Sequence, residues 1–230
     1  MTTGPRVVCV PGLGLRADDW RAAAAELEDL VAARTSVRQL PGYGIRPRRD
    51  DDLRPASLGA RLGDELPPGA AVLVGHSASC QVVAHAAATA PGRVRGLVLV
   101  GPTTDPRART WHHLAGRWLA TAARERPWQV PLLVRDYGRT GPGAMARAMQ
   151  DARHDDIRHV LARTDVPVLV VRGRHDRICP ADWASQVAAA GPRGGHVVTL
   201  VSGAHMVPLT HPRPVASAIA AWLGDLPATS

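Results

Sequence analysis

Three polar residues whose types act together in nucleophilic chemistry each stand a few positions after an apolar run: Ser77, Asp176 and His205. A serine hydroxyl is a poor nucleophile at neutral pH, so a base must take its proton. An imidazole can do this, and a carboxylate bonded to it fixes its tautomer and stabilises the imidazolium ion. These residues therefore predict nucleophilic catalysis by Ser77, with His205 as base and then acid, and Asp176 behind it.

The stretch around Ser77 connects an apolar run to an alanine-rich one and reads Val-Gly-His-Ser-Ala-Ser-Cys. A strand, a tight turn with serine at its apex and a helix form a nucleophile elbow, which exposes the serine hydroxyl above the sheet. Small residues must flank the serine because the strand and the helix approach closely, and Gly75 and Ala78 meet this need. Ser79 stands where the motif usually has its second glycine, so the match is incomplete.

The order of apolar and helical patterns predicts the architecture that positions these residues. Apolar runs predict strands over residues 6–10, 36–40, 71–74, 94–100, 166–171 and 196–201. Helical patterns cover residues 18–33, 57–66, 78–90, 181–190 and 214–223. Ser57 is expected to cap the second helix. Strands separated by helices imply an α/β fold with a doubly wound, mostly parallel sheet of about six strands and helices on both faces. Functional groups collect at the carboxyl ends of such strands.

Residues 102–164 interrupt this alternation and are expected to form a helical lid insert, because they show helix signals and no strand run. The core domain then comprises residues 1–101 and 165–230. Trp111, Leu114 and Trp118 fall on one helical face of the insert. We expect this face to bind an apolar part of the substrate, although packing of the lid onto the core would produce the same pattern.

An anionic intermediate on Ser77 would need two backbone N–H groups that point at the developing charge. The residue after the nucleophile supplies one, which is Ala78 here. The turn after the first strand supplies the other, and Leu13 is the candidate because glycines on both sides let its backbone approach a substrate.

Composition excludes several classes of protein. The chain has 230 residues, enough for one domain with a sizeable core, and carries a net charge of +8. Its basic residues are all arginines and are scattered, so no nucleic-acid partner is expected. The N-terminus lacks a signal-peptide pattern and no apolar run approaches a membrane span, which favours a cytoplasmic protein without a membrane partner. The oligomeric state stays open.

Cysteines and histidines give no sign of a metal centre. Cys9, Cys80 and Cys179 form no C-x-x-C pair, and buried reduced thiols are the expected state. Cys80 lies one helical turn beyond Ser77. Its packing in the core as a small residue is favoured over a position at the edge of a substrate pocket. His154 and His159 are five positions apart and cannot share one helical face, so no metal is expected.

In these motifs the chain resembles the α/β-hydrolase superfamily, over nearly its whole length. The matching segments are 10–14, 40–44, 75–79, 173–176 with Pro180, and 203–205 with Pro212. The order Ser77, Asp176, His205 is the family's order. The resemblance implies hydrolysis of esters, lactones, thioesters or C–C bonds next to carbonyls, without a cofactor, on a small and largely apolar substrate. The chain begins at the family's third strand, so the N-terminal antiparallel hairpin is expected to be missing.

Three alternatives remain open at this stage. Gly12, Gly14 and Ala17 match the G-x-G-x-x-A pattern of dinucleotide-binding folds, and Arg38 would suit the 2′-phosphate of NADP. That interpretation leaves the serine, aspartate and histidine unexplained. The same fold also hosts lyases and cyclases of biosynthetic pathways. Finally, Asp105 is the reserve candidate for the acid that orients the histidine.

Overall fold

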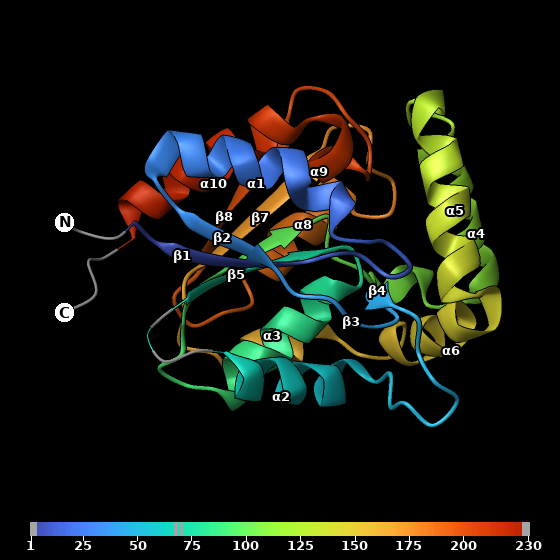
Figure 1. Ribbon diagram of the computed structural model, residues 1–230, viewed down its shortest axis with the longest axis horizontal. Coiled ribbons are helices and arrows are strands. Elements are labelled where there is room, and N and C mark those ends of the chain that lie inside the picture. Colours follow the sequence, from blue (N-terminus) through green and yellow to red (C-terminus); the bar gives the residue numbers. More distant parts are fainter. Residues whose placement is uncertain (1–3, 67–68, 70, 227–230) are drawn as a thin grey trace.

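Six parallel strands form the sheet at the centre of the molecule (Figure 1). The structure is a computed structural model that describes residues 4–66, 69 and 71–226. The strands are β1 (Arg6–Val10), β2 (Arg34–Val37), β5 (Ala71–His76), β6 (Val94–Val100), β7 (Val168–Gly173) and β8 (Gly195–Leu200). Their order is β2-β1-β5-β6-β7-β8, and every neighbouring pair is parallel. This confirms the predicted α/β class and the number of strands.

The strand order reverses direction between β1 and β5. From β1 the chain moves outward to β2, returns to β5 and then proceeds outward to β8. In open α/β sheets the crevice at such a reversal, outside the carboxyl ends of the strands, is where ligands bind. Leu13 follows β1 and Ser77 follows β5, so the two residues flank this crevice.

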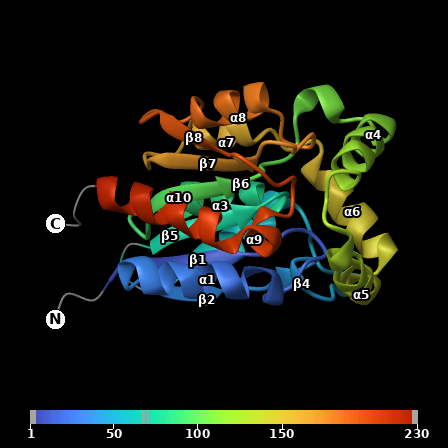
Figure 2. The same ribbon diagram turned by 90° about the horizontal axis from the view of Figure 1, so that it is seen from above.

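Helices cover both faces of the sheet, and each face has its own apolar core (Figures 1 and 2). One face packs against α1 (Asp18–Val31), α9 (Val207–Thr210) and α10 (Pro212–Asp225). The other packs against α2 (Pro55–Glu65), α3 (Ser79–Thr89), α7 (Ile157–Leu161) and α8 (Ala181–Ala188). The central strand β5 is buried along its whole length, which agrees with the unbroken apolar sequence of its first four residues, 71–74.

The segment between β6 and β7 forms helices, as predicted, together with short 3₁₀ turns. It contains η1 (Pro106–Ala108), α4 (Trp111–Ala122), η2 (Pro127–Gln129), α5 (Val130–Thr140) and α6 (Pro142–Ala152) before α7. Helices α4, α5 and α6 stand beyond the carboxyl edge of the sheet, at the opposite end of the molecule from the start of β1 (Figure 2). Helix α7 instead packs into the core, where Ile157 and Leu161 are fully buried.

Two local predictions are wrong. Ser57 does not cap α2: the helix begins at Pro55, and the Ser57 hydroxyl donates to Asp52 at 2.7 Å. Proline suits a first helical position because its fixed φ is pre-organised and its missing N–H is not needed there. The second strand ends at Val37, not at residue 40, because Leu40–Pro41 (β3) pairs with Gly44–Ile45 (β4) in a separate two-stranded ladder.

No helix within the described ranges is long and apolar enough to cross a membrane.

Candidate active site

Ser77 sits at the apex of a sharp turn between β5 and α3. Its φ is 58°, in the left-handed region that non-glycine residues rarely adopt. The turn is held because the Ser77 N–H donates to the Val100 carbonyl at 2.9 Å. A side chain at Gly75 would place its Cβ 2.8 Å from the Cα of Cys80, so strand and helix do approach closely enough to require glycine there.

Ser79 fits the position where a glycine is usual. Its hydroxyl oxygen accepts the His76 N–H at 2.8 Å and lies 2.9 Å from the carbonyl oxygens of both Val10 and His76. The side chain is fully buried and ties the elbow to β1. The Ser79 side chain therefore stabilises the turn through hydrogen bonds that a glycine at this position would not make.

His205 and Asp176 form a buried pair. Nδ1 of His205 lies 2.8 Å from Oδ2 of Asp176, whose side chain is 1% exposed. The other oxygen, Oδ1, accepts the N–H groups of Ile178 at 2.9 Å and Cys179 at 3.0 Å. The carboxylate is therefore fixed by three donors, and the Nε2 atom of His205 is left for other partners.

Burial and mutual attraction act against each other in this pair. Burial alone would lower the pKa of His205, but the charge and hydrogen bond of Asp176, with a contribution from Glu125, outweigh it and raise that pKa. Burial would raise the pKa of Asp176, and His205 with the two backbone donors lowers it instead. The geometry thus favours an ionised carboxylate beside an imidazole that holds a proton well.

His76 contacts the backbone of the loop that carries His205. Its Nε2 lies 3.0 Å from the carbonyl oxygen of His205. Burial, and then the nearby His205, lower the pKa of His76 to about 3, so its ring is neutral and Nε2 carries the proton that it donates.

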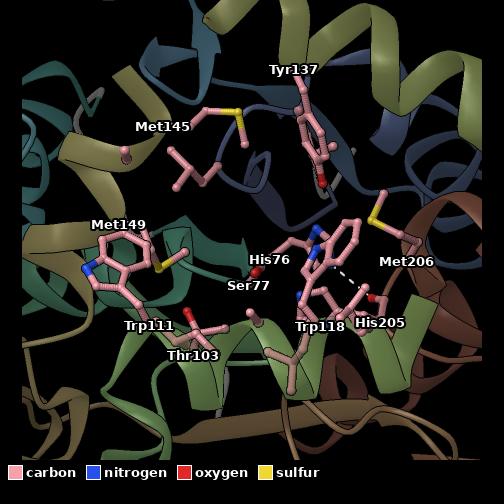
Figure 3. Close-up of a pocket in the computed structure, with 17 residues that line it drawn as sticks. His76, Ser77, Thr103, Trp111, Trp118, Tyr137, Met145, Met149, His205 and Met206 are labelled. Carbon is pink, nitrogen blue, oxygen red and sulfur yellow. Dashed lines mark hydrogen bonds between the residues drawn. The ribbon is translucent and has the colours of Figure 1, made fainter. Parts of the chain in front are cut away.

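One cavity of about 460 Å³ brings most of the predicted residues together (Figure 3). Ser77 and His205 line it from the sheet edge, and Leu13 lines it from the turn after β1. The predicted substrate-binding residues all line it from α4: Trp111, Leu114 and Trp118. Asp176 is not among the lining residues and lies behind His205. Most of the other walls are apolar and include Tyr137, Met145, Met149 and Met206.

The two predicted N–H donors, Leu13 and Ala78, belong to turns at the same edge of the sheet as Ser77. Ala78 is the next residue and begins the turn into α3, and Leu13 is in contact with the same cavity as Ser77. Within the described residues, neither of their N–H groups has a protein acceptor. Both are thus available to an oxyanion, which keeps the prediction open to test.

The sequence comparisons decide the family. A family model described as "Alpha/beta hydrolase family" matches residues 7–218. The chain belongs to the alpha/beta hydrolase family. The match covers both core segments and the helical segment between them.

Curated and solved relatives of this alpha/beta hydrolase agree with that assignment. It is 30% identical to a pimeloyl-[acyl-carrier protein] methyl ester esterase of Methylococcus capsulatus, with 90% of each chain covered. It is 28% identical to the protein of the same name from Stenotrophomonas maltophilia, covering 97% of this chain and 94% of that one. A solved hydrolase of Pseudomonas aeruginosa shares the fold with a TM-score of 0.72 at 23% identity, covering 97% of this chain and 91% of that one. The two curated matches and the family model support a hydrolase enzyme, and the solved structure shows the shared fold.

Two residues of the site in this alpha/beta hydrolase were missed by sequence reasoning. A Cβ at Gly101 would lie 3.0 Å from the His205 ring and 3.1 Å from Asp176, close enough to displace the pair, and its φ of 56° also favours glycine. Its position directly after a strand and before Pro102 was a usable signal. Glu125 accepts the backbone N–H groups of His205 and Met206, both at 2.7 Å. No local pattern marks Glu125, because its partners are about 80 residues away.

Asp105 is occupied elsewhere. Its buried carboxylate binds Arg107 and Arg117, each at 2.7 Å. Burial would raise its pKa, but these guanidinium groups lower it below the usual value. The side chain joins η1 to α4, which is a structural task and disfavours it as the partner of His205.

The glycine-rich turn after β1 faces the apolar cavity. A Cβ at Gly14 would lie 2.8 Å from Tyr137 and 3.0 Å from Met145. Such surroundings do not suit the pyrophosphate of a dinucleotide, which needs donors and a helix N-terminus. In the described part of the chain, no group of three or more His, Cys, Asp or Glu side chains could hold a metal ion.

Proposed function

We propose that the protein hydrolyses carboxylic esters through Ser77, His205 and Asp176. One arrangement carries this proposal. Ser77 has a left-handed backbone conformation and lines a cavity that His205 also lines. Oδ2 of Asp176 lies 2.8 Å from Nδ1 of that histidine. The remaining ring nitrogen, Nε2, is the one that can exchange a proton with the Ser77 hydroxyl.

The reaction then has two halves. Oγ of Ser77 bonds to the ester carbonyl carbon while Nε2 of His205 takes the hydroxyl proton, and the N–H groups of Leu13 and Ala78 stabilise the oxyanion. The bond to the alcohol breaks, and the alcohol oxygen takes the proton from His205. Water then attacks the acyl-serine with the same base, which releases the carboxylic acid and restores Ser77.

The apolar cavity supports a substrate with an aliphatic or aromatic acyl group. Trp111, Leu114 and Trp118 are proposed to contact this group, and the helical segment of residues 102–164 is proposed to act as a lid. The names of the relatives point to a methyl ester of a carrier-bound acyl chain as one member of this class to assay. A cytoplasmic location, expected from the sequence, and the lack of a cofactor, implied by the family resemblance, belong to the same proposal.

A fluorophosphonate probe tests the nucleophile. We expect intact-protein mass spectrometry to show one adduct on the wild type and on Ser185→Ala, an exposed serine on α8 that serves as the control. The Ser77→Ala variant should show none and should lose turnover of p-nitrophenyl esters. An adduct that persists on Ser77→Ala would move the nucleophile elsewhere, and cleavage products without a free acid would indicate a lyase or cyclase instead.

A further inference from the structure

A second cavity of about 300 Å³ lies on the other side of Trp118 and Tyr137, between α4, η2 and α5. His205 and Met206 line both cavities. Ser77 lines the first cavity and does not belong to the described walls of the second. Trp118, Tyr137 and Ile178 also line both cavities, so His205 is one of five described residues at the boundary between them, and Ser77 faces the first cavity.

The second cavity offers a ligand few polar contacts. Gln129 is fully buried, and its Oε1 accepts no hydrogen bond in the described structure, although Nε2 donates to Glu125 at 2.9 Å. That oxygen is enclosed by protein atoms, so it adds no polar contact to the surface of the cavity. The rest of the wall is mainly apolar, with Leu133 and Val134 from α5.

The chemistry of ester cleavage distinguishes the two sides. The two arms of an ester leave the carbonyl carbon in different directions. The carbonyl carbon must meet Ser77 with its oxygen toward the N–H groups of Leu13 and Ala78. The leaving oxygen must lie within hydrogen-bond reach of His205, because that residue returns the proton to it. The alcohol arm therefore extends from the side of His205, and the acyl arm from the side of Ser77.

We propose that the second cavity holds the alcohol arm of the substrate, and that this alcohol is largely apolar and larger than methanol. The inference rests on the proposed ester hydrolysis. An apolar cavity of about 150 Å³ is enough for a benzene ring, so a methoxy group would leave most of this space empty. A benzyl or butyl alcohol would fill it and bury apolar surface against α5.

Two exposed lid positions provide a matched pair of variants. Val130 lines the second cavity and Ala115 lines the first, and both side chains are exposed, so a tryptophan at either site should be tolerated by the fold. We would measure kcat/KM for methyl and benzyl butanoate, which vary the alcohol, and for methyl acetate and methyl octanoate, which vary the acyl group. Leu133→Trp is a second, deeper obstruction of the same cavity.

We expect Val130→Trp and Leu133→Trp to lower the benzyl-to-methyl ratio roughly tenfold and to leave the octanoate-to-acetate ratio unchanged. Ala115→Trp should do the reverse. If the second-cavity variants instead change the acyl ratio, or change neither ratio, the assignment is overturned. Ratios within one variant cancel any loss of folded enzyme.

A binding measurement separates failure of this inference from failure of the proposed function. If the wild type cleaves no ester, the hydrolase proposal fails, while saturable binding of benzyl alcohol to Ser77→Ala by ligand-observed NMR still decides the cavity. Binding that is weakened by Val130→Trp and kept in Ala115→Trp supports the assignment. Binding that is unaffected by Val130→Trp overturns it.

A separate observation concerns Glu125. Its Oε1 accepts the N–H groups of both His205 and Met206, and its Oε2 accepts Nε2 of Gln129. The residue belongs to the lid segment, so one carboxylate connects the lid to the backbone of the histidine loop. We infer that Glu125 is a positioning residue, which holds His205 in place when the lid is docked and adds a negative charge near its ring.

The groups that face His205 come from three elements. Asp176 follows β7, His76 ends β5 and is neutral, and Glu125 follows α4. Asp176 and Glu125 both raise the pKa of His205. The base works as the neutral imidazole, so activity falls as pH drops through this pKa. Removing the charge of Glu125 should lower the pKa and keep activity to more acidic pH.

Glu125→Gln tests this because it keeps an oxygen that can accept the two N–H groups and removes the charge. We expect the acid limb of kcat/KM, and the NMR titration of the His205 ring, to move to lower pH, because a neighbouring negative charge that raises the pKa of His205 is removed. Glu65→Gln, on the surface of α2 and paired with Arg61, is the control and should not move either. Glu125→Ala should lower kcat more than it changes KM. An unmoved NMR titration in Glu125→Gln would overturn the inference, whether or not the protein cleaves esters.

Discussion

At the scale of single residues, Asp176 and Asp105 show how burial and partners separate two similar carboxylates. Both lie just beyond a strand and both are buried, but Asp176 binds an imidazole and two backbone donors, whereas Asp105 binds two arginines. A carboxylate whose charge is neutralised by two guanidinium groups would stabilise an imidazolium ion only weakly. These contacts favour Asp176 over Asp105 in the proposed role of orienting His205.

Asp176→Asn should leave the protein folded and lower kcat by about 10⁴, because the amide stabilises the wrong imidazole tautomer. Steady-state kinetics on a p-nitrophenyl ester measure this effect, and circular dichroism checks the fold. Asp105→Asn should keep near-normal turnover and lower the melting temperature, since it weakens the contacts of η1 with α4. The opposite pattern would reassign the acid.

Gly75→Ala gives a second residue-scale prediction. The added methyl group would lie 2.8 Å from the Cα of Cys80, so that α3 must move away from β5. Since Ser77 lies between the two elements, its hydroxyl would move as well. We expect labelling by a fluorophosphonate to slow far more than in Gly116→Ala, an open position on α4 where a Cβ meets nothing within 4 Å. Equal labelling rates in the two variants would show that the close approach is not needed for the nucleophile.

The residues that sequence reasoning identified, and those it missed, differ in what their roles depend on. Ser77, Asp176 and His205 could be singled out because each follows an apolar strand, which is a local pattern. Glu125 acts through backbone groups about 80 positions away, and no local pattern encodes such a contact. Ser79 looked like a departure from the motif, since its hydrogen bonds to β1 and to the turn are visible only in three dimensions.

At the scale of elements, two tryptophans on α4 allow the proposed lid function to be tested. Trp111 and Trp118 line the cavity over Ser77, and each is 47% exposed. Arg153, the residue directly after α6, lies over the Trp111 ring, with its guanidinium carbon 5.2 Å from the ring centre. The helix therefore presents indole surface to the cavity while its outer side meets water.

Trp111→Ala or Trp118→Ala should reduce kcat/KM for long or aromatic acyl esters roughly tenfold more than for acetate esters, because only the larger acyl groups reach the lost apolar surface. The ratio of two esters in the same variant is the quantity to measure. Trp128→Ala provides the control, because Trp128 is 51% exposed and is absent from the walls of both cavities in the described structure. Equal losses on both esters would mean that the two tryptophans only pack the lid.

Element boundaries were harder to predict than element types. The strands over 6–10 and 94–100 match the prediction, while the helix predicted to start at residue 57 starts at Pro55. Hydrophobic periodicity identifies a helix, but its first residue depends on proline geometry and on which side chain finds a partner. The small β3–β4 ladder could not be predicted, because two-residue strands contain no period to detect.

At the scale of the whole molecule, the two apolar cores enclose all three cysteines. Cys9, Cys80 and Cys179 are free and at most 2% exposed. Burial raises the pKa of Cys9 to about 12, and it raises those of Cys80 and Cys179 well above their ordinary value. Thiolates are the reactive form, so the folded protein should hold three inert thiols.

Ellman's reagent should therefore find no reactive thiol in the native protein and three in guanidinium chloride. Because the cysteines lie in both cores, their exposure should follow the same denaturant transition as the loss of helix measured by circular dichroism. Val201→Cys, at a position that is 87% exposed, should add one thiol that reacts at once. A native cysteine that reacts well before the helices melt would reveal local opening of one core.

The start of β1 and the end of α10 lie at the edge of the sheet away from α4, α5 and α6 (Figure 1). A peptide tag or a fused partner attached before β1 or after α10 would therefore join the molecule on the side remote from α4, α5 and α6. An enzyme tethered to a bead or an electrode through such an extension would present its entrance to the bulk solution. Immobilisation chemistry can therefore be chosen at the ends of the chain without crowding the route by which substrate arrives.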